Sequence, residues 1–331
     1  MATMEPPSST TDGLPGKIKA ANAQHIDTNV PVQNGLQSWK PRFVDIGINL
    51  TDPVYIGLYH GTQRHENDLS AVVRRAVDIG CEKLIVTGSD LEHSKDAVRL
   101  AGEFRVHPCN AQSLTPETLS SLTTLAQTSI KAGQAVAFGE IGLDYDRLEL
   151  CPKDIQLRAF EQQLSLAVQL QVPLFLHSRA AHADFLRLLS EHKKDLPKRG
   201  VVHSFTGTVE EMRELVDRGW HIGVNGCSLK TQENCDVVRE IPLHMLHLET
   251  DGPWCEIRPA HTSSAILAKM HPGMGWGGWK SVKKEKWVEG AVVKGRNESC
   301  FIGRVAWAVA GIKGLSVQEV VDAAWKNSVT I

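Results

Sequence analysis

The 331-residue sequence has no long hydrophobic run, no C-x-x-C pair and no excess of charge of either sign. Its apolar runs are shorter than the roughly 18 residues that a transmembrane helix needs, so nothing predicts a membrane association. The 36 basic and 38 acidic residues leave a formal net charge of -2. This balance excludes a protein that holds nucleic acid through its overall charge, although it leaves room for a local basic patch.

The seven cysteines are scattered and odd in number. In a chain of this size such cysteines are typical of reduced thiols and not of a disulfide framework or a structural zinc site. The N-terminus lacks the apolar core of a secretory signal, and Glu5 and Asp12 argue against a mitochondrial presequence. We therefore expect a protein of the cytoplasm or the nucleus that is neither secreted nor membrane-spanning.

Residues 1–40 differ in composition from the rest of the chain. They are rich in Pro, Ser, Thr and Gly and show no periodicity. Such a segment cannot bury enough apolar surface to offset the entropy of ordering it, so we predict a disordered arm. Residues 41–331 are predicted to form one folded domain.

Within that domain, seven short runs of β-branched and apolar residues predict seven strands. Near-continuous apolar runs are typical of parallel strands that are covered on both faces. The runs are 43–50, 82–90, 135–144, 172–178, 200–207, 220–226 and 246–253. Helical patterns lie between them, and repeated β–α units over about 250 residues predict either a doubly wound sheet or a closed (β/α)8 barrel.

One helical pattern follows the first strand. Leu69, Val72, Val73, Ala76 and Val77 are predicted to form one apolar stripe, and Gly80 is predicted to end the helix.

The chain is one strand short of an eight-stranded barrel. Before His107 only residues 104–106 could form the third strand, whereas a barrel strand needs roughly five residues at about 3.3 Å each. Either this strand is truncated in the sequence, or the stretch is a loop and the sheet is open there. Losing a strand would expose two sheet edges.

Four polar residues stand near the carboxyl ends of four different predicted strands: Glu140, His177, His203 and Asp251. The carboxyl ends of parallel strands converge on the ligand site, and a buried carboxylate or imidazole there is costly unless it is paired or bound to a metal. A lone histidine at a strand end is more often structural, but the coincidence of all four favours a site for Mg, Mn or Zn. Because no thiolate accompanies them, a structural zinc is disfavoured.

The first predicted strand adds Asp45 and Asn49, which lie on one face if the period of two holds. Asp45 is predicted either to ligate a metal or to hold a neighbouring ligand. Asn49 is neutral and would be a weak ligand.

The chain resembles the TatD family of metal-dependent deoxyribonucleases, and its eukaryotic branch in particular, in seven segments that occur in the same order: DIGINLTDPVYIGLYHG, GEIGLDYDR, FLHSR, VVHSFTG, NGCSLKT, LETDGPWC and GRNES. The resemblance covers residues 43–331. It implies an amidohydrolase-like (β/α)8 barrel with one or two divalent ions, Mg or Mn with Zn as a further option. It also implies hydrolysis of DNA phosphodiester bonds by a metal-activated water, as a 3′–5′ exonuclease mainly on single strands.

The resemblance also implies roles for individual residues. Glu140 looks like the carboxylate that anchors the metal, and His177 and His203 look like its imidazole ligands. Asp251 looks like the last-strand ligand that also orients the attacking water. His107 belongs to the family's HP loop and could donate to the scissile phosphate, the alternative being a solvated loop histidine.

Three features depart from the family pattern. Many members carry His-x-His on the first strand where this chain has residues 45–49, which leaves the first metal position poorer in nitrogen ligands. The family normally has an apolar strand and a Gly immediately before the HP loop, and relatives usually continue beyond Ile331.

Several basic residues are candidates for binding the substrate. Arg179 directly follows the His177 strand and is a candidate phosphate clamp. Residues 269–296 carry seven positive residues against two glutamates, and three tryptophans are interleaved with them. Basic and aromatic residues together are typical of single-strand binding, so Lys283, Lys284 and Lys286 are predicted to contact DNA. The alternative is a solvated lysine face whose tryptophans only pin a long insertion.

Two other functions stay open. The first is a related metallohydrolase acting on another ester or amide, because one fold serves many substrates. The second is a weakly active scaffold that binds metal or nucleic acid. The sequence gives no basis for naming a protein partner.

Overall fold

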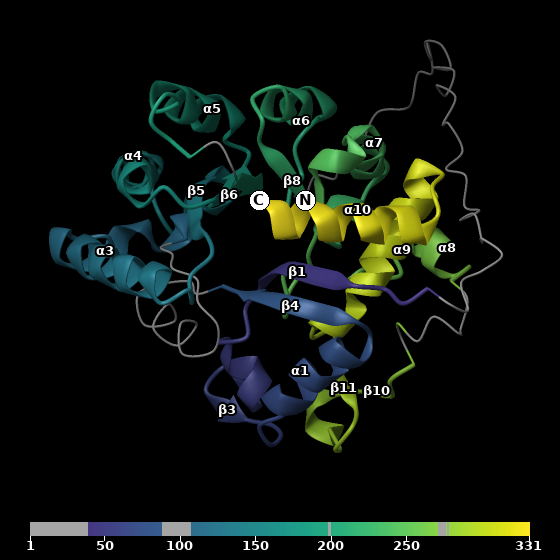
Figure 1. Cartoon of the computed structure of the whole chain (residues 1–331). Helices are drawn as coiled ribbons and strands as arrows, with labels where there is room; N and C mark the ends of the chain where they lie inside the picture. Colours follow the sequence, from purple (N-terminus) through teal and green to yellow (C-terminus); the bar gives the residue numbers. More distant parts are fainter. Residues whose placement is uncertain (1–38, 88–106, 198–199, 271–275, 277) are drawn as a thin grey trace, which may run out of the picture.

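The computed structural model describes residues 39–87, 107–197, 200–270, 276 and 278–331. Among these residues, two parallel ladders, one of two strands and one of five, form the wall of the barrel (Figure 1), and their seven strands confirm the seven predicted from the sequence. Their bounds are β1 Phe43–Ile48, β4 Cys81–Val86, β5 Phe138–Asp144, β6 Leu174–Arg179, β7 Gly200–Val202, β8 His221–Val224 and β9 Leu246–Leu248.

The strands follow one another in chain order around a ring. β4 pairs with β1, and β5 through β9 pair consecutively. The segment after β9 returns to β1, because the Asp251 N–H donates to the Gly47 carbonyl and the Asn49 N–H donates to the Gly252 carbonyl, each at 2.8 Å. A doubly wound sheet would reverse its strand order, so that alternative is wrong and the fold is a (β/α)8-type barrel. The expected short strand before His107 and residues 1–38 of the arm predicted at 1–40 lie outside the described residues. Of the two arm residues that are described, Trp39 packs against the core, contrary to the prediction.

Helices surround the sheet (Figure 1). No single helix in the described ranges is both long and apolar enough to cross a membrane. The α-helices are α1 Leu69–Asp78, α3 Pro116–Lys131, α4 Lys153–Leu170, α5 His182–Glu191, α6 Val209–Val216, α7 Gln232–Glu240, α8 Ser264–Leu267, α9 Ile302–Lys313 and α10 Val317–Thr330. Two short ladders lie outside the barrel, β2 Leu58–Tyr59 with β3 Thr62–Gln63 and β10 Ser281–Val282 with β11 Val292–Val293.

In α1 the predicted apolar stripe is partly wrong. Val72 and Ala76 are buried as expected, but Val77 is 60% exposed. At about 100° per residue, Val77 lies roughly 140° away from Val72 around the helix and faces solvent. Arg75 is buried instead. Gly80 ends the helix as predicted, at a φ of 93° that favours glycine.

The buried Arg75 belongs to an ionic cluster that ties α1 to the segment before α9. Arg296 bonds to both oxygens of Asp68 at 2.6 and 2.8 Å and to Glu298 at 2.8 Å. Nε of Arg75 donates to the other Glu298 oxygen at 2.9 Å. All four side chains are almost fully buried, and removing one partner of such a cluster would leave an uncompensated charge. The GRNES segment is therefore anchored beside the end of β9.

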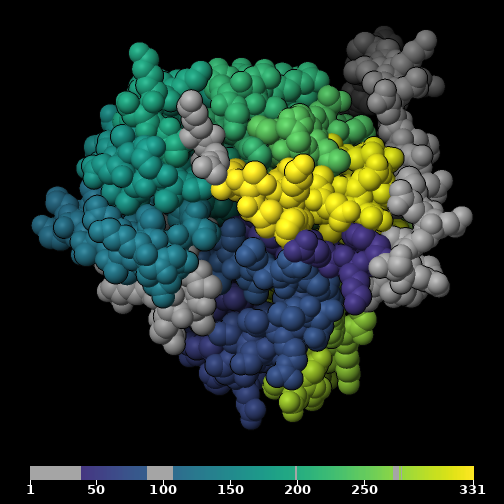
Figure 2. All heavy atoms as spheres, in the orientation of Figure 1, coloured from purple at the N-terminus to yellow at the C-terminus, as the bar shows by residue number. Residues whose placement is uncertain are grey.

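The barrel interior below the carboxyl ends is apolar. Val44 and Ile46 of β1 pack with Phe175 of β6 and Val201 of β7, strands that are not neighbours of β1 in the sheet, so these contacts cross the interior. Trp325 and Ile331 at the end of the chain join this cluster. α10, yellow in Figure 2, packs against β1 and β9 and covers this end of the barrel. Buried His247 of β9 bonds to Ser328 of α10 at this end, whereas the candidate site described below lies at the opposite, carboxyl end.

Candidate active site

Three of the predicted residues meet at the carboxyl ends of β5, β6 and β7. The Glu140 Oε1 atom lies 2.7 Å from Nδ1 of His177 and 2.8 Å from Nε2 of His203. The two imidazole nitrogens are 3.1 Å apart, and all three side chains are buried. The predicted convergence of Glu140, His177 and His203 is therefore present in the structure.

The geometry of this group fits a divalent cation. Neighbouring ligand atoms about 2.1 Å from an octahedral ion are about 3 Å apart, and the three sides of the Glu140–His177–His203 triangle measure 2.7, 2.8 and 3.1 Å. One carboxylate oxygen and two imidazole nitrogens are also donor types that Mg, Mn or Zn accept. A second group of possible ligands, His107, Asp144 and His177, shares His177 with the first.

A second carboxylate lies behind each histidine. Nε2 of His177 is 3.4 Å from Oδ2 of Asp144, and Nδ1 of His203 is 3.4 Å from Oε2 of Glu249. Both outward nitrogens are buried and make no hydrogen bond with the described residues. A carboxylate behind a histidine is the usual arrangement at metal sites, where it fixes the ring orientation and raises the basicity of the ligand. The sequence reasoning assigned no chemistry to Asp144 and missed Glu249.

Glu249 fits tightly between two strands. A side chain at Gly47 would lie 2.9 Å from one Glu249 oxygen, and a side chain at Gly223 would lie 3.1 Å from the other. The Ser204 N–H donates to Glu249 Oε1 at 2.5 Å, and Nδ2 of Asn225 is 3.3 Å away. Glycine at both positions is what admits the carboxylate. Its position two residues before Asp251 was the available sequence signal, because alternate residues of a strand share a face.

The charge states at the site also suit a cation. Burial lowers the pKa of His177 to about 4, so the ring is neutral at pH 7 and has no proton to lose before binding a metal. Burial pushes the pKa of Asp144 upward, but the adjacent His177 imidazole and the Arg179 guanidinium outweigh burial, so the pKa is lowered. An ionised carboxylate therefore lies beside a neutral imidazole.

Asp251 lies just after β9, where the chain meets β1. Its Oδ1 accepts from Nδ2 of Asn49 at 3.1 Å, and its Oδ2 lies 3.3 Å from Sγ of Cys255. Asp251 belongs to neither ligand group found among the described residues. Its φ of 52° and those of Ser204 and Cys255, 49° and 56°, are left-handed. Such strained non-glycine residues cluster at functional sites.

Asp45 lies apart from the Glu140 group. Its two oxygens accept from the backbone N–H of Thr250 at 2.9 Å and from the Thr250 hydroxyl at 2.5 Å. Burial raises its pKa to about 6. The β1–β4 register shifts between Asp45 and Ile48, so the assumed period of two does not carry through to Asn49. The structure thus places Asp45 where it holds the segment that carries Asp251.

His107 precedes the 3-10 helix η2, Pro108–Ser113, and faces Glu140. Its Nδ1 accepts from the Cys109 N–H at 3.1 Å, so the neutral ring carries its proton on Nε2. That Nε2 lies 3.1 Å from Glu140 Oε1. The structure therefore joins His107 to the metal-ligand candidates, and the solvated-loop alternative is wrong.

Arg179 lies at the edge of the site. Its guanidinium is 3.5 Å from Asp144 Oδ2 and 29% exposed. It also lines a cavity of about 630 Å³ together with His182 and Thr208, over the ends of β6 and β7. The arginine is therefore within reach of a ligand that enters this cavity.

The three tryptophans of the basic loop are packed against the fold. Trp276 is buried and contacts Phe43, Trp279 lies against Phe301, and Trp287 stacks on His65. This packing favours the alternative in which the tryptophans pin the loop.

The lysines of the same loop remain near the surface. Lys283 and Lys284 line a cavity of about 320 Å³ with Tyr59 and Arg296, whereas Lys286 is exposed beside it. Tyr59 and Arg296 also line a second cavity of about 320 Å³ with Trp254, which is 59% exposed. Through these shared residues, the lysines adjoin the segment that follows Asp251.

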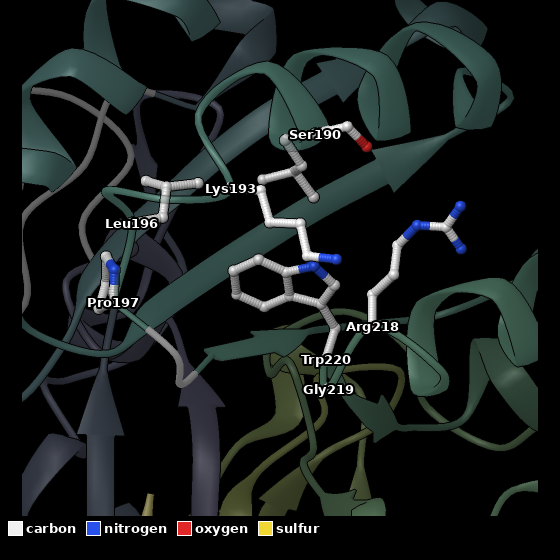
Figure 3. Close-up of a pocket in the computed structure, with 8 residues that line it drawn as sticks. Ser190, Lys193, Leu196, Pro197, Arg218, Gly219 and Trp220 are labelled. Atoms are coloured by element: carbon white, nitrogen blue, oxygen red, sulfur yellow. The ribbon is translucent and has the colours of Figure 1, made fainter.

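A further cavity, of about 350 Å³, opens at the other end of the barrel. Figure 3 shows Trp220, which directly precedes β8, with Lys193, Leu196 and Pro197 around it. None of the carboxylates or histidines described above lines it. This cavity is therefore separate from the candidate active site.

Comparisons with known proteins agree with this geometry. Residues 44–331 match the family model described as TatD related DNase. The chain is 46% identical to the deoxyribonuclease Tat-D of Schizosaccharomyces pombe over 88% of this chain and 95% of that protein. It is 37% identical to the 3'-5' ssDNA/RNA exonuclease TatD of Citrobacter koseri over 63% of this chain and 78% of that protein. The crystal structure of a TatD family hydrolase from Entamoeba histolytica superposes with a TM-score of 0.80 at 34% identity, covering 88% of this chain and 98% of that one.

Proposed function

Because this chain belongs to the TatD-related DNase family, we propose that it is a metal-dependent deoxyribonuclease. The proposed activity is 3′–5′ exonucleolytic hydrolysis of phosphodiester bonds, mainly in single-stranded DNA. The observation that carries the proposal is the convergence of His177, His203 and His107 on one oxygen of Glu140. We further propose that the protein acts in the cytoplasm or the nucleus, where its thiols would stay reduced.

Glu140, His177 and His203 would hold one divalent ion, Mg or Mn, with Zn as a further option. Asp251 is assigned to the same centre, and Asp45 supports the segment that carries it. His107 and Asp144, together with the shared His177, offer a place for a second ion. A bound divalent ion would neutralise charge on the phosphate and lower the pKa of a bound water.

The remaining roles are proton transfer and the orientation of the two histidine ligands. Asp251 would accept the proton of the attacking water, because its carboxylate stands at the mouth of the barrel in a strained backbone. With one ion bound, His107 would donate from Nε2 to a phosphate oxygen, a role that excludes it as a ligand of a second ion. Glu249 and Asp144 would keep His203 and His177 in the ligating orientation.

Binding of the DNA strand is assigned to Arg179 and to the lysines beside the Trp254 cavity. Arg179 offers a planar donor pair to a phosphate. Lys283, Lys284 and Lys286 would follow the phosphate backbone away from the site. The exposed indole of Trp254, three residues after Asp251, would stack on a base, a contact worth about 1–3 kcal/mol.

Reversing the charge of Lys283, Lys284 and Lys286 to Glu is expected to weaken DNA binding. For single strands, each lost phosphate contact lowers the slope of log K against log salt by about 0.7. Fluorescence anisotropy of a labelled oligonucleotide at several salt concentrations measures this slope.

The matched control changes three positive residues at the far end of the barrel, Lys193, Lys194 and Arg218, to Glu. The change in net charge is the same, but binding and its salt slope should stay close to those of the wild type. An equal loss in both variants would mean that only overall charge acts and would remove the loop from the substrate site.

The activity itself is tested by timed digestion of end-labelled DNA. Purified protein with Mg or Mn should release nucleotides from the 3′ end of single-stranded DNA faster than from a duplex, and chelator should stop the reaction. Side-by-side assays with acyl esters and amides test for another metallohydrolase activity. No turnover of any substrate, with metal still bound, would favour a scaffold over an enzyme.

A further inference from the structure

We propose that Cys227 and Cys255 form an oxidation site, a thiol pair that a peroxide converts into an intramolecular disulfide beside the candidate active site. Their Sγ atoms are 3.1 Å apart, and both residues are free thiols of intermediate exposure. Cys227 begins the 3-10 helix η4, Cys227–Leu229, after β8. Cys255 follows β9, so the pair joins two neighbouring strand ends.

The two segments are already placed for a disulfide. A disulfide bond is about 2.05 Å long, so the sulfurs need to approach by only about 1 Å. Their backbones are in direct contact, since a side chain at Gly226 would overlap the Cys255 carbonyl oxygen. Four of the other cysteines, Cys81, Cys151, Cys235 and Cys300, are buried. Cys109 lies near Asp144 instead, so the pairing is specific.

The chemistry balances with hydrogen peroxide as the oxidant. One thiol is oxidised to a sulfenic acid as the O–O bond breaks, and one water leaves. The second sulfur then attacks the first, forming the S–S bond and releasing a second water. The two thiols lose two protons and two electrons, and one peroxide becomes two waters.

Oxidation would also change the hydrogen bonding of Asp251. The Cys255 thiol donates to Oδ2 of Asp251 at 3.3 Å, and the disulfide removes that donor. Losing one hydrogen bond to the carboxylate that is assigned to accept the proton is expected to slow DNA hydrolysis about fivefold. This consequence rests on the proposed nuclease function, whereas the disulfide itself does not.

The experiment treats the full chain with hydrogen peroxide, blocks remaining thiols and maps the peptides by mass spectrometry. The expected result is one cross-linked peptide pair containing Cys227 and Cys255, with a loss of two thiols. DNA hydrolysis falls in parallel and recovers with dithiothreitol. Cys227→Ser should keep its basal activity, form no such cross-link and resist peroxide, while Cys151→Ala should behave like the wild type.

Two results would overturn the proposal. Cys109 is the other thiol of intermediate exposure. If Cys227 and Cys255 can still be alkylated after Cys109 has reacted with peroxide, the pair is not an oxidation site. If Cys227→Ser loses activity to peroxide as fast as the wild type, the effect on Asp251 is wrong. A protein without nuclease activity would contradict the proposed function alone, because the peptide map does not depend on turnover.

Discussion

Replacing Glu140 with Gln is expected to lower kcat/KM for DNA by more than about 100-fold, beyond the 10–100-fold range typical of residues that only orient ligands. One Glu140 oxygen lies within 3.1 Å of three imidazole nitrogens, so the amide would remove a negative charge from the centre of the site. Affinity for Mn should fall together with activity, and a calorimetric titration alongside the digestion assay measures both.

Glu249→Gln is the informative comparison for this variant. Glu249 lies behind His203 and not at the centre of the site. Its substitution should therefore lower kcat/KM and the affinity for Mn by about 10–100-fold. Glu161→Gln, an exposed position on α4, should change neither quantity. Nuclease activity that survives in Glu140→Gln at the wild-type level would point to a contaminating enzyme and contradict the assignment.

Asp251→Asn is expected to lower kcat by about 10²–10⁴-fold, the range typical of a lost general base. Metal affinity should fall less than in Glu140→Gln, because Asp251 lies outside both ligand groups found among the described residues. The asparagine keeps the shape of the side chain but cannot accept a proton from water. Single-turnover digestion at saturating DNA separates this chemical step from binding.

The matched control for this substitution is Asp78→Asn. Asp78 is an exposed residue at the end of α1. Its kcat should stay within about threefold of the wild type, as is usual for surface positions away from the chemistry. If Asp251→Asn retained wild-type kcat, another group would have to take the proton and the role given to Asp251 would be wrong.

The centre of the site could be predicted because one rule governs it. Glu140, His177 and His203 each follow a run of apolar residues that predicts a strand, and the carboxyl ends of parallel strands meet. Asp144 and Glu249 were harder to assign, because their importance depends on which way each histidine ring turns. That orientation is set by side-chain packing, including the space left at Gly47 and Gly223, and no pattern in the sequence encodes it.

The strands were predictable for a similar reason, since burial on both faces imposes continuous apolar runs. The failures lie where tertiary contacts override a local pattern. Arg75 is buried in α1 because Asp68 and Glu298 compensate its charge, and Glu298 comes from a segment far along the chain. Trp276 is buried because it packs against Phe43 of β1. This contact between distant parts of the chain could not be predicted from the pattern of residues in the basic loop.

The most direct test is to locate the metal in crystals of the full chain soaked in Mn, by anomalous diffraction. The account predicts a peak about 2.0–2.3 Å from Oε1 of Glu140, Nδ1 of His177 and Nε2 of His203. A peak elsewhere at saturating Mn, with those three atoms bonded only to one another, would contradict it.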